Sequence, residues 1–527
     1  MKPPIRMTAL RARGIAALVF CSALALYTLT AGGSLTSTDA VVTFDLTSSL
    51  VERHSMALSG NVLGLEANRG VDGRFYSQYG IGQSIYNIPF YIAGKLAARL
   101  APRRIGKPDT LLKAAVAMGS AVAAALAVLL IWSLSHRLGA TPRGACIAAL
   151  TAAISSPLWP YSKFGFSTAL TAALLIGAVR LLAEVVAPGT AGRIPGETTG
   201  AKRGIDAAPH PGARDVRYAA AAGVVIGFGW LTRHEMALLL LPFGAALVLA
   251  ARERRTQVPW RPISALAGAA AAGGVLWAWY NIVRFGSPVS VGYSPRLDVS
   301  GYAAFLIAPA GSIALFAPVA IVWGIGIAWA RWGASIRVLL IGPVITFYAF
   351  YGALADWAGG RSYGPRYLVP FLVLLAPGAA ALWDAGGRRR RIVLAVCVVA
   401  ALFQLPGVLV DYSKVSVDWA GSASQDAIAN RNWRVASSPI VLDTAAMARA
   451  VPANIAYLSG RRPPPRVATS AGADDRGFAQ QLSFSIDFWW VYLFYLRAIG
   501  SSAALVCAAV LLVACCGCAG AAWRLAG

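Results

Sequence analysis

Acidic residues are scarce in this chain, so an aspartate in an unusual place invites a chemical explanation. The 527 residues include only 22 Asp and Glu. Asp39 lies in the run Thr36-Ser37-Thr38-Asp39, directly after the first apolar segment. An ionisable side chain at a membrane face is costly to keep there, and it indicates a functional role by default. The alternative is structural, because Thr38 or Asp39 could simply cap a following helix.

Basic residues occupy short loops between apolar segments. These loops contain Lys163, Arg233, His234, Arg361 and Arg366. A guanidinium group binds phosphate through two parallel hydrogen bonds, so several arginines at one membrane face could hold a lipid phosphate. A single arginine is explained equally well by phospholipid headgroups or by a helix C-terminus. Arg233 and Arg366 together favour a phosphate site, because each lies beside a helix start on the same predicted face.

A third polar region combines glycine with tyrosine. Residues 73–83 read Gly-Arg-Phe-Tyr-Ser-Gln-Tyr-Gly-Ile-Gly-Gln and include Arg74, Tyr76 and Tyr79. Glycine lets a backbone approach a ligand closely, and tyrosine offers an apolar ring with one polar tip. An interfacial aromatic belt with turn glycines would have the same composition. The density of polar groups beside an apolar helix favours a ligand site.

The composition indicates that membrane helices must position these residues. Hydrophobic residues make up 57% of the chain and charged residues 13%, about half the share of an average soluble domain. These values argue against a soluble multi-domain protein and exclude intrinsic disorder. The formal charge of +25 would suggest nucleic acid in a soluble protein. In a membrane protein it indicates basic cytoplasmic loops instead, and we expect no nucleic-acid partner.

Hydropathy predicts an all-α, polytopic protein of about twelve transmembrane helices, with both termini on the cytoplasmic side. The predicted spans are residues 14–32, 111–134, 144–160, 167–187, 217–232, 236–251, 262–281, 311–330, 336–355, 367–384, 392–411 and 498–520. A cleaved signal peptide is the competing interpretation of residues 1–32, but no clear cleavage site follows them.

Residues 84–100 decide the topology. If this segment crossed the membrane, the basic loops near Arg137, Arg254 and Arg388 would lie outside. We therefore expect a helix that lies in the outer interface, with its long cations reaching toward water. A reporter fused near Arg104 that reads cytoplasmic would contradict this topology.

The predicted topology divides the chain into three parts. Residues 1–411 form the transmembrane catalytic region, with a first outer loop at 33–110. Residues 412–485 form a small periplasmic segment, and 486–527 add an interfacial helix and the last span. The loop 188–214 is rich in Gly, Pro, Ala and Arg and is predicted to be a flexible cytoplasmic linker. All seven cysteines lie in apolar segments, which predicts neither a disulfide framework nor a metal site.

Several of these segments together resemble the GT-C superfamily of integral-membrane glycosyltransferases. The likeness is to bacterial family 39-like enzymes, relatives of protein mannosyltransferases and of the lipid A aminoarabinose transferase. It spans roughly residues 35–370. The matching stretches are Ser37-Thr38-Asp39, Asp72 to Gly82 with Pro89-Phe90, Thr232-Arg233-His234-Glu235, Asn281 with Arg284 to Pro288, and Trp357 to Arg366.

The resemblance implies an activity. Such enzymes move a sugar from a polyprenyl-phosphate carrier to an acceptor hydroxyl at the outer face of the cytoplasmic (inner) membrane, usually with inversion. The carboxylate early in the first outer loop, here Asp39, would be the general base. A placed carboxylate typically contributes about 10²–10⁴-fold to rate. The departing phosphate needs fixed cations, for which Arg233, Arg361 and Arg366 are the candidates.

This chain departs from the pattern in its second outer loop. Some relatives carry a second acid there, but residues 157–167 contain none. We therefore expect no cofactor and find no support for a divalent metal; Lys163 could take over part of the phosphate neutralisation. The acceptor stays open between a glycan, a lipid and a protein. The alternatives are a transporter or flippase of polyprenyl-linked glycans, and a non-catalytic envelope scaffold. Against transport, most ionisable residues lie at helix ends and no paired halves are visible.

Overall fold

The computed structural model describes residues 8–35, 37–59, 62, 67–100, 108–187, 212–292, 296–465 and 485–527. Two predicted segments fall largely outside this part of the chain: the linker at 188–214 and the end of the 412–485 segment. Arg103, Arg104 and Lys107 also lie outside it, so the basic residues that bear on the topology of 84–100 are only partly placed.

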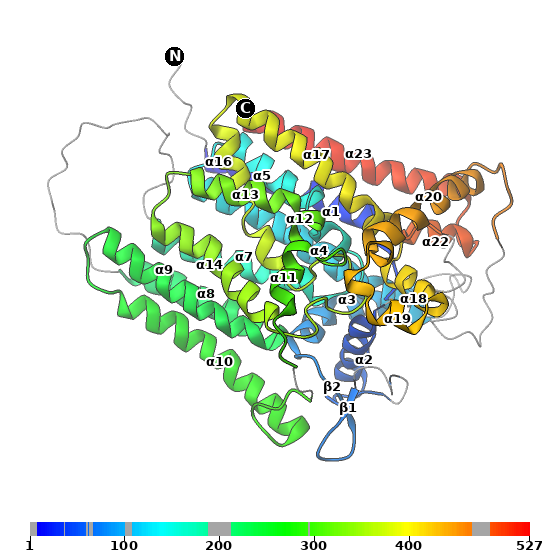
Figure 1. Ribbon diagram of the computed structural model, residues 1–527, viewed down its shortest axis with the longest axis horizontal. Coiled ribbons are helices and arrows are strands. Elements are labelled where there is room, and N and C mark those ends of the chain that lie inside the picture. The colour runs from blue at the N-terminus through cyan, green and yellow to red at the C-terminus, as the bar shows by residue number, and fades with distance from the viewer. Residues whose placement is uncertain are drawn as a thin grey trace.

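Every segment that the sequence predicts as a span is helical, and together these helices form one bundle (Figure 1). They are α1 (Ala9–Leu29), α4 (Pro108–Arg137), α5 (Pro142–Ile154) with α6 (Leu158–Tyr161), α7 (Ser167–Val186), α8 (Ala213–Thr232), η2 (His234–Leu239) with α9 (Leu240–Glu253), α10 (Trp260–Phe285), α12 (Ile313–Phe316) with α13 (Pro318–Trp329), α14 (Ala334–Gly352), α15 (Val369–Val373) with α16 (Pro377–Asp384), α17 (Gly387–Leu409) and α23 (Ser501–Ala526). Among the described residues, eight helical stretches are long and apolar enough to cross a membrane, and three shorter apolar helices accompany them. The predicted all-α, polytopic class is therefore confirmed.

The remaining helices are shorter or more polar, and they gather at one end of the bundle. They are α2 (Thr38–Glu52), α3 (Gly82–Leu100), α11 (Ser300–Ile307), α18 (Tyr412–Ser422), α19 (Gln425–Ala429), α20 (Pro439–Leu458) and α22 (Trp489–Tyr495). Strands β1 (Ala67–Arg69) and β2 (Phe75–Ser77) pair antiparallel and form a small hairpin beside α2 (Figure 1). The α3 helix contains Pro89 and is not among the eight candidate spans of the described chain. Its expected place in the outer interface stays a prediction.

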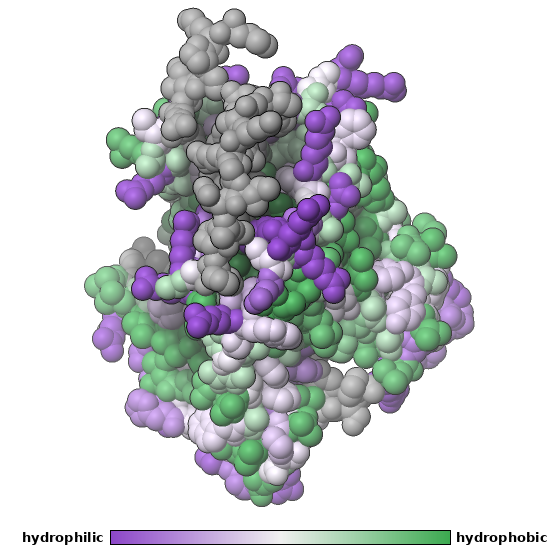
Figure 2. All heavy atoms as spheres, turned by 90° about the vertical axis from the view of Figure 1, so that its left-hand side faces the viewer, coloured by the Kyte–Doolittle hydropathy of each residue, from purple (hydrophilic) through white to green (hydrophobic). Residues whose placement is uncertain are grey.

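The interior of the bundle is built from small apolar side chains. Ala169, Ala172 and Leu175 of α7 are among many residues of that helix that water does not reach. Small side chains allow helices to approach closely when the surrounding medium is as apolar as the core. The outward faces are also apolar: Val224, Leu241 and Val275 are each more than 60% exposed. Figure 2 looks at the left-hand side of Figure 1 and shows hydrophilic side chains interspersed with apolar areas.

Helices α8 and α10 are in direct backbone contact. A Cβ added at Gly273 would lie 2.2 Å from the carbonyl oxygen of Gly227, and one at Gly223 would lie 2.3 Å from the carbonyl oxygen of Leu266. Real Cβ atoms cannot approach so near, so the two backbones touch directly along this seam. The seam fixes the ends of both helices relative to each other.

Two ends of the bundle can be distinguished by their ion pairs. At one end Arg137, Arg180 and Arg214 share Glu184, with nitrogen–oxygen distances of 2.9, 2.8 and 3.1 Å. Helix α8 starts at this end and runs through 20 residues to Thr232, about 30 Å away. Asp39 lies at the far end, which we call the Asp39 end.

Candidate functional site

Asp39 sits in the first turn of α2, but it does not cap the helix. The cap is Ser37, whose side chain accepts a hydrogen bond from the backbone N–H of Ala40 at 3.2 Å. The structural alternative for Asp39 is therefore wrong, and its side chain is free for another partner. The positive end of the helix dipole still favours a carboxylate in this turn.

The partner of Asp39 is Arg366. A guanidinium N–H of Arg366 donates to a carboxylate oxygen of Asp39, although 327 residues separate the two. Arg366 belongs to the loop between α14 and α15. The structure thus joins two residues that the sequence selected independently, the expected base and an expected phosphate-binding arginine.

Arg366 is enclosed by the protein and is only 7% exposed. Its guanidinium carbon lies 4.1 Å from the centre of the Phe166 ring, and Nη1 donates to the carbonyl oxygen of Gly359 at 3.3 Å. Burial alone would lower the pKa of Arg366, but Asp39 outweighs it and the pKa is raised. Its Nε–H is buried without a hydrogen-bond partner. An unmatched buried donor is costly, so this N–H is available to a ligand.

A second arginine lies beside the first. The ring of Tyr367 has Arg233 at 5.2 Å and Arg366 at 5.8 Å from its centre. Arg233 is held by its own carboxylate, since its Nε lies 3.7 Å from Oε1 of Glu235. The hydroxyl of Tyr351 also donates to Glu235, and its ring stacks on Tyr367 with centres 4.7 Å apart. The two expected phosphate-binding arginines therefore flank one aromatic ring.

The electrostatics of Arg233 follow from this arrangement. Burial alone would lower its pKa, but Tyr351 and Glu235 outweigh burial, so the pKa of Arg233 is raised. The arginine is charged at any working pH, and each of the two guanidinium groups has a carboxylate of its own. We call the six residues Asp39, Arg366, Tyr367, Arg233, Glu235 and Tyr351 the paired-arginine cluster.

One further acid borders this cluster. The hydroxyl of Tyr367 lies 3.5 Å from Oδ2 of Asp356, in the loop after α14. Neighbouring groups shield its carboxyl from water and raise the pKa of Asp356, while Arg366 opposes the rise. Asp356, Tyr351 and Tyr367 were not among the site residues predicted from the sequence. The scarcity of acids in outer loops, which singled out Asp39, would have selected Asp356 as well.

The glycines of segment 73–83 hold the end of α8 in place. A Cβ at Gly80 would lie 2.1 Å from the carbonyl oxygen of Leu231, and one at Gly82 would lie 2.4 Å from the hydroxyl oxygen of Thr232. Only glycine allows this approach. Arg233 follows Thr232 directly, so the close packing of this segment on Leu231 and Thr232 helps to fix the position of Arg233.

The other expected residues of this segment make separate contacts. Arg74 is exposed and pairs with Asp72 at 2.6 Å, and the buried Tyr76 donates to the same carboxylate at 2.8 Å. The carbonyl oxygen of Tyr79 accepts from Arg284 at 3.3 Å, which anchors the hairpin to the end of α10. None of the contacts in the described part of the chain joins these residues to the paired-arginine cluster.

Lys163 is buried inside the protein, whereas a phosphate-binding residue was expected to be accessible in a short outer loop. It is 0% exposed, and its Nζ lies 2.7 Å from Oδ2 of Asp487, itself 1% exposed at the side chain. Lys163 also donates to the carbonyl oxygen of Val408. The hydroxyl of Tyr492 donates to Asp487 at 2.5 Å. We call the ion pair of Lys163 with Asp487 the closed pair; Tyr492 is the tyrosine that donates to it.

Two expected residues border the cluster without entering it. His234 stacks on Trp277 with ring centres 5.8 Å apart, and its Nδ1 lies 3.6 Å from Oε2 of Glu235. Arg361 is exposed in the same loop as Arg366. Within the described residues, no group of three or more His, Cys, Asp or Glu is arranged to hold a metal ion.

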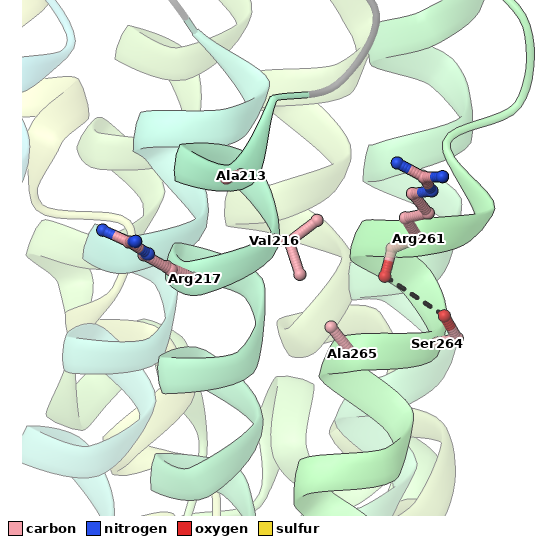
Figure 3. Close-up of a pocket in the computed structure, with 6 residues that line it drawn as sticks. All are labelled: Ala213, Val216, Arg217, Arg261, Ser264 and Ala265. Atoms are coloured by element: carbon pink, nitrogen blue, oxygen red, sulfur yellow. Dashed lines mark hydrogen bonds between the residues drawn. The ribbon is translucent and has the colours of Figure 1, made fainter.

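A groove of about 600 Å³ lies at the opposite end of the bundle (Figure 3). It is lined by Ala213, Val216 and Arg217 at the start of α8 and by Arg261, Ser264 and Ala265 at the start of α10. In Figure 3 the Arg217 side chain points away from Arg261 across α8, so the two arginines do not converge. The groove is remote from Asp39 and is not part of the candidate site.

Comparisons with known proteins give a likeness in structure alone. No protein-family model matches the chain, and no curated protein matches it in sequence. The crystal structure of ArnT from Cupriavidus metallidurans in the apo state matches 98% of this chain and 78% of its own, with a TM-score of 0.52 at 13% identity.

Two further solved structures match less closely. ArnT from the same organism bound to undecaprenyl phosphate covers 96% of this chain and 78% of its own, at 14% identity and a TM-score of 0.47. The oligosaccharyltransferase AglB from Archaeoglobus fulgidus covers 94% of this chain and 64% of its own, at 14% identity and a TM-score of 0.42. The apo ArnT match shows that this chain has a GT-C fold, as the sequence motifs predicted.

Proposed function

We propose that this protein is a glycosyltransferase that moves a sugar from a polyprenyl-phosphate carrier to an acceptor hydroxyl. The observation that carries the proposal is the paired-arginine cluster at one end of a GT-C fold. The cluster combines two carboxylates, two fixed cations and one unmatched buried N–H on Arg366. The positive-inside distribution of the basic loops supports the periplasmic face of the inner membrane as its location.

The residues divide the chemistry between them. Asp39 accepts the proton of the acceptor hydroxyl, which is a poor nucleophile without a base. The attacking oxygen forms a bond to the anomeric carbon while the bond from that carbon to the carrier phosphate oxygen breaks. Attack from the side opposite the phosphate inverts the configuration. Arg233 and Arg366 stabilise the charge that develops on the departing phosphate, as preorganised cations do in other active sites.

We further propose that the reaction needs no cofactor. The two guanidinium groups supply the positive charge that the leaving phosphate requires. Arg361, His234, Arg74, Tyr76 and Tyr79 stay predicted donor-site residues, while the burial of Lys163 gives no support for a direct contact with phosphate. The acceptor class, whether glycan, lipid or protein, is left to direct product analysis.

The test is mass spectrometry of cell-envelope glycans from a deletion strain complemented with variants. Asp39→Asn should reduce the transferred sugar by about 10²–10⁴-fold, because the base is lost and the shape is kept. Glu52→Gln is the matched control, since it removes a carboxylate from the other end of α2, where Glu52 pairs with Lys95 at 2.7 Å, and it should restore wild-type product. Full product with Asp39→Asn would remove the base role and would favour transport of a finished glycan.

A further inference from the structure

In the structure the proposed base already has a partner. A carboxylate oxygen of Asp39 accepts a hydrogen bond from Arg366, so this oxygen is not open to an acceptor hydroxyl while Arg366 holds it. The reverse also holds, because an arginine occupied by a carboxylate has less to offer a phosphate. Phosphate binds a guanidinium group through two parallel N–H groups, and beside the unmatched Nε–H of Arg366 lies Nη2, which donates to Asp39. A phosphate bound in this way therefore competes with Asp39 for Nη2.

The two members of this pair are held unequally. Arg366 is fixed by the Phe166 ring and by the carbonyl oxygen of Gly359, and it is only 7% exposed. The Asp39 side chain is 19% exposed and stands in the first turn of α2, where the helix end itself favours a negative charge. A phosphate that approaches the fixed Arg366 can thus replace Asp39 without leaving a buried carboxylate unsolvated.

Arg233 differs from Arg366 in this respect. Its carboxylate is Glu235, which also accepts a hydrogen bond from Tyr351 and whose side chain is 9% exposed. Glu235 has no proton to remove in the proposed reaction, so this second pair is constant. Arg366 alone joins the reacting carboxylate to the phosphate-binding arginines.

The charge changes of the proposed reaction occur on the two groups that Arg366 can bind, Asp39 and the carrier phosphate. The acceptor proton neutralises Asp39, while the electron pair of the broken bond leaves one additional negative charge on the carrier phosphate. The negative charge thus disappears beside Arg366 on one side and appears in the phosphate on the other. One fixed cation can serve both partners in turn.

We propose that Arg366 is a shared counter-ion that binds Asp39 before the donor arrives and the carrier phosphate afterwards. This inference rests on the proposed function and deepens it. It makes the donor the first substrate, because the carboxylate oxygen of Asp39 can accept from a hydroxyl only when the phosphate has taken Arg366. An acceptor hydroxyl, or water, that arrives earlier meets an oxygen already occupied by Arg366.

The experiment measures equilibrium binding of undecaprenyl phosphate to the full-length protein in lipid nanodiscs. Asp39→Asn removes the competitor for Arg366, so the variant should bind the lipid about 5- to 20-fold more tightly than wild type, a coupling of ordinary size between two ligands of one group. Asp39→Ser removes the same carboxylate with a different replacement and should give the same gain. Glu52→Gln, which changes a carboxylate at the other end of α2, should leave the affinity unchanged.

A double-mutant cycle assigns the gain to Arg366. Arg366→Gln should bind the lipid more weakly than wild type, and adding Asp39→Asn to it should bring no further change. Unchanged or weaker binding by both Asp39 variants, with normal binding by wild type, would overturn the shared counter-ion. Wild-type protein that does not bind undecaprenyl phosphate at all would instead refute the proposed function, so the two failures are distinguishable.

Discussion

Two cation–carboxylate pairs in the described part of the chain, Lys163–Asp487 and Arg366–Asp39, differ in how fully the protein encloses them. Lys163 and Asp487 are 0% and 1% exposed, and Lys163 also donates to a backbone carbonyl while Tyr492 donates to Asp487. The Asp39 side chain is 19% exposed, so the second pair is open to water on one side. Each pair keeps one buried polar atom without a hydrogen-bond partner, Oδ2 of Asp487 and Nε of Arg366. An enclosed pair can contribute only to the fold, whereas a pair that is open on one side can exchange its partner for a ligand.

The largest effect should come from breaking the closed pair. Lys163→Met keeps the length of the side chain but leaves Asp487 buried without its cation. Removing one partner of a buried pair typically costs about 3–5 kcal/mol of unfolding free energy. The measurement is chemical or thermal unfolding of the purified protein in detergent.

Arg366→Gln is the matched comparison for that measurement. Its loss of stability should be clearly smaller, because Asp39 is 19% exposed and can be hydrated once its partner is removed. Equal losses in the two variants would show that both pairs are structural and would end the distinction between them.

A second prediction concerns Asp411, which lies near the closed pair. Here the removal of a charge should raise the stability of the protein, whereas in Lys163→Met it lowers the stability. Asp411 begins α18, and burial together with the nearby Asp487 raises its pKa to about 7. The folded protein then holds the Asp411 proton more tightly than the unfolded chain does. Its stability should therefore fall as the pH rises from about 4 to about 7.

Asp411→Asn tests this dependence. Asparagine keeps the capping role, in which Asp411 now accepts from the N–H of Lys414 at 3.1 Å, and it removes the titration. The variant should be more stable than wild type by about 1–3 kcal/mol at pH 8, with little difference at pH 4. An equal stability difference at both pH values would contradict the assignment to Asp411.

The smallest effect on stability should come from an exposed ion pair. Arg74 and Asp72 face water, with side chains 62% and 33% exposed. Arg74→Gln should leave the unfolding temperature unchanged, because exposed ion pairs contribute little. The same variant tests the predicted donor-site role of Arg74, since a large loss of undecaprenyl phosphate binding without unfolding would place this residue in the site.

Features that depend on neighbouring residues in the sequence could be predicted, whereas contacts between residues far apart in the sequence could not. Hydropathy is a local property, so every predicted span was recovered as a helix. The positions of Asp39, Arg233 and Arg366 also had a local signal, because each is a charge beside an apolar segment. The pairing of Asp39 with Arg366 had none, since a contact across 327 residues depends on how the helices pack.

The dependence on distant contacts also explains why Lys163 was predicted to bind phosphate. Its loop reads as polar and exposed, and its partner Asp487 is more than 300 residues away in a segment predicted to be interfacial. Nothing local reveals that the two meet inside the protein. Glu235 and Tyr351 likewise lie on different helices, so their contact follows from the tertiary structure alone.

The glycine seam between α8 and α10 has a mechanical consequence. Backbones in direct contact at Gly227 and Gly273 cannot slide past each other without collision, so the two helices behave as one rigid unit. One end of this unit carries Arg233, beside the site, and also Arg284, which donates to the carbonyl oxygen of Tyr79 just after the hairpin. A displacement of the segment around Tyr79 would therefore reach Arg233 through this rigid unit and not through a flexible connection.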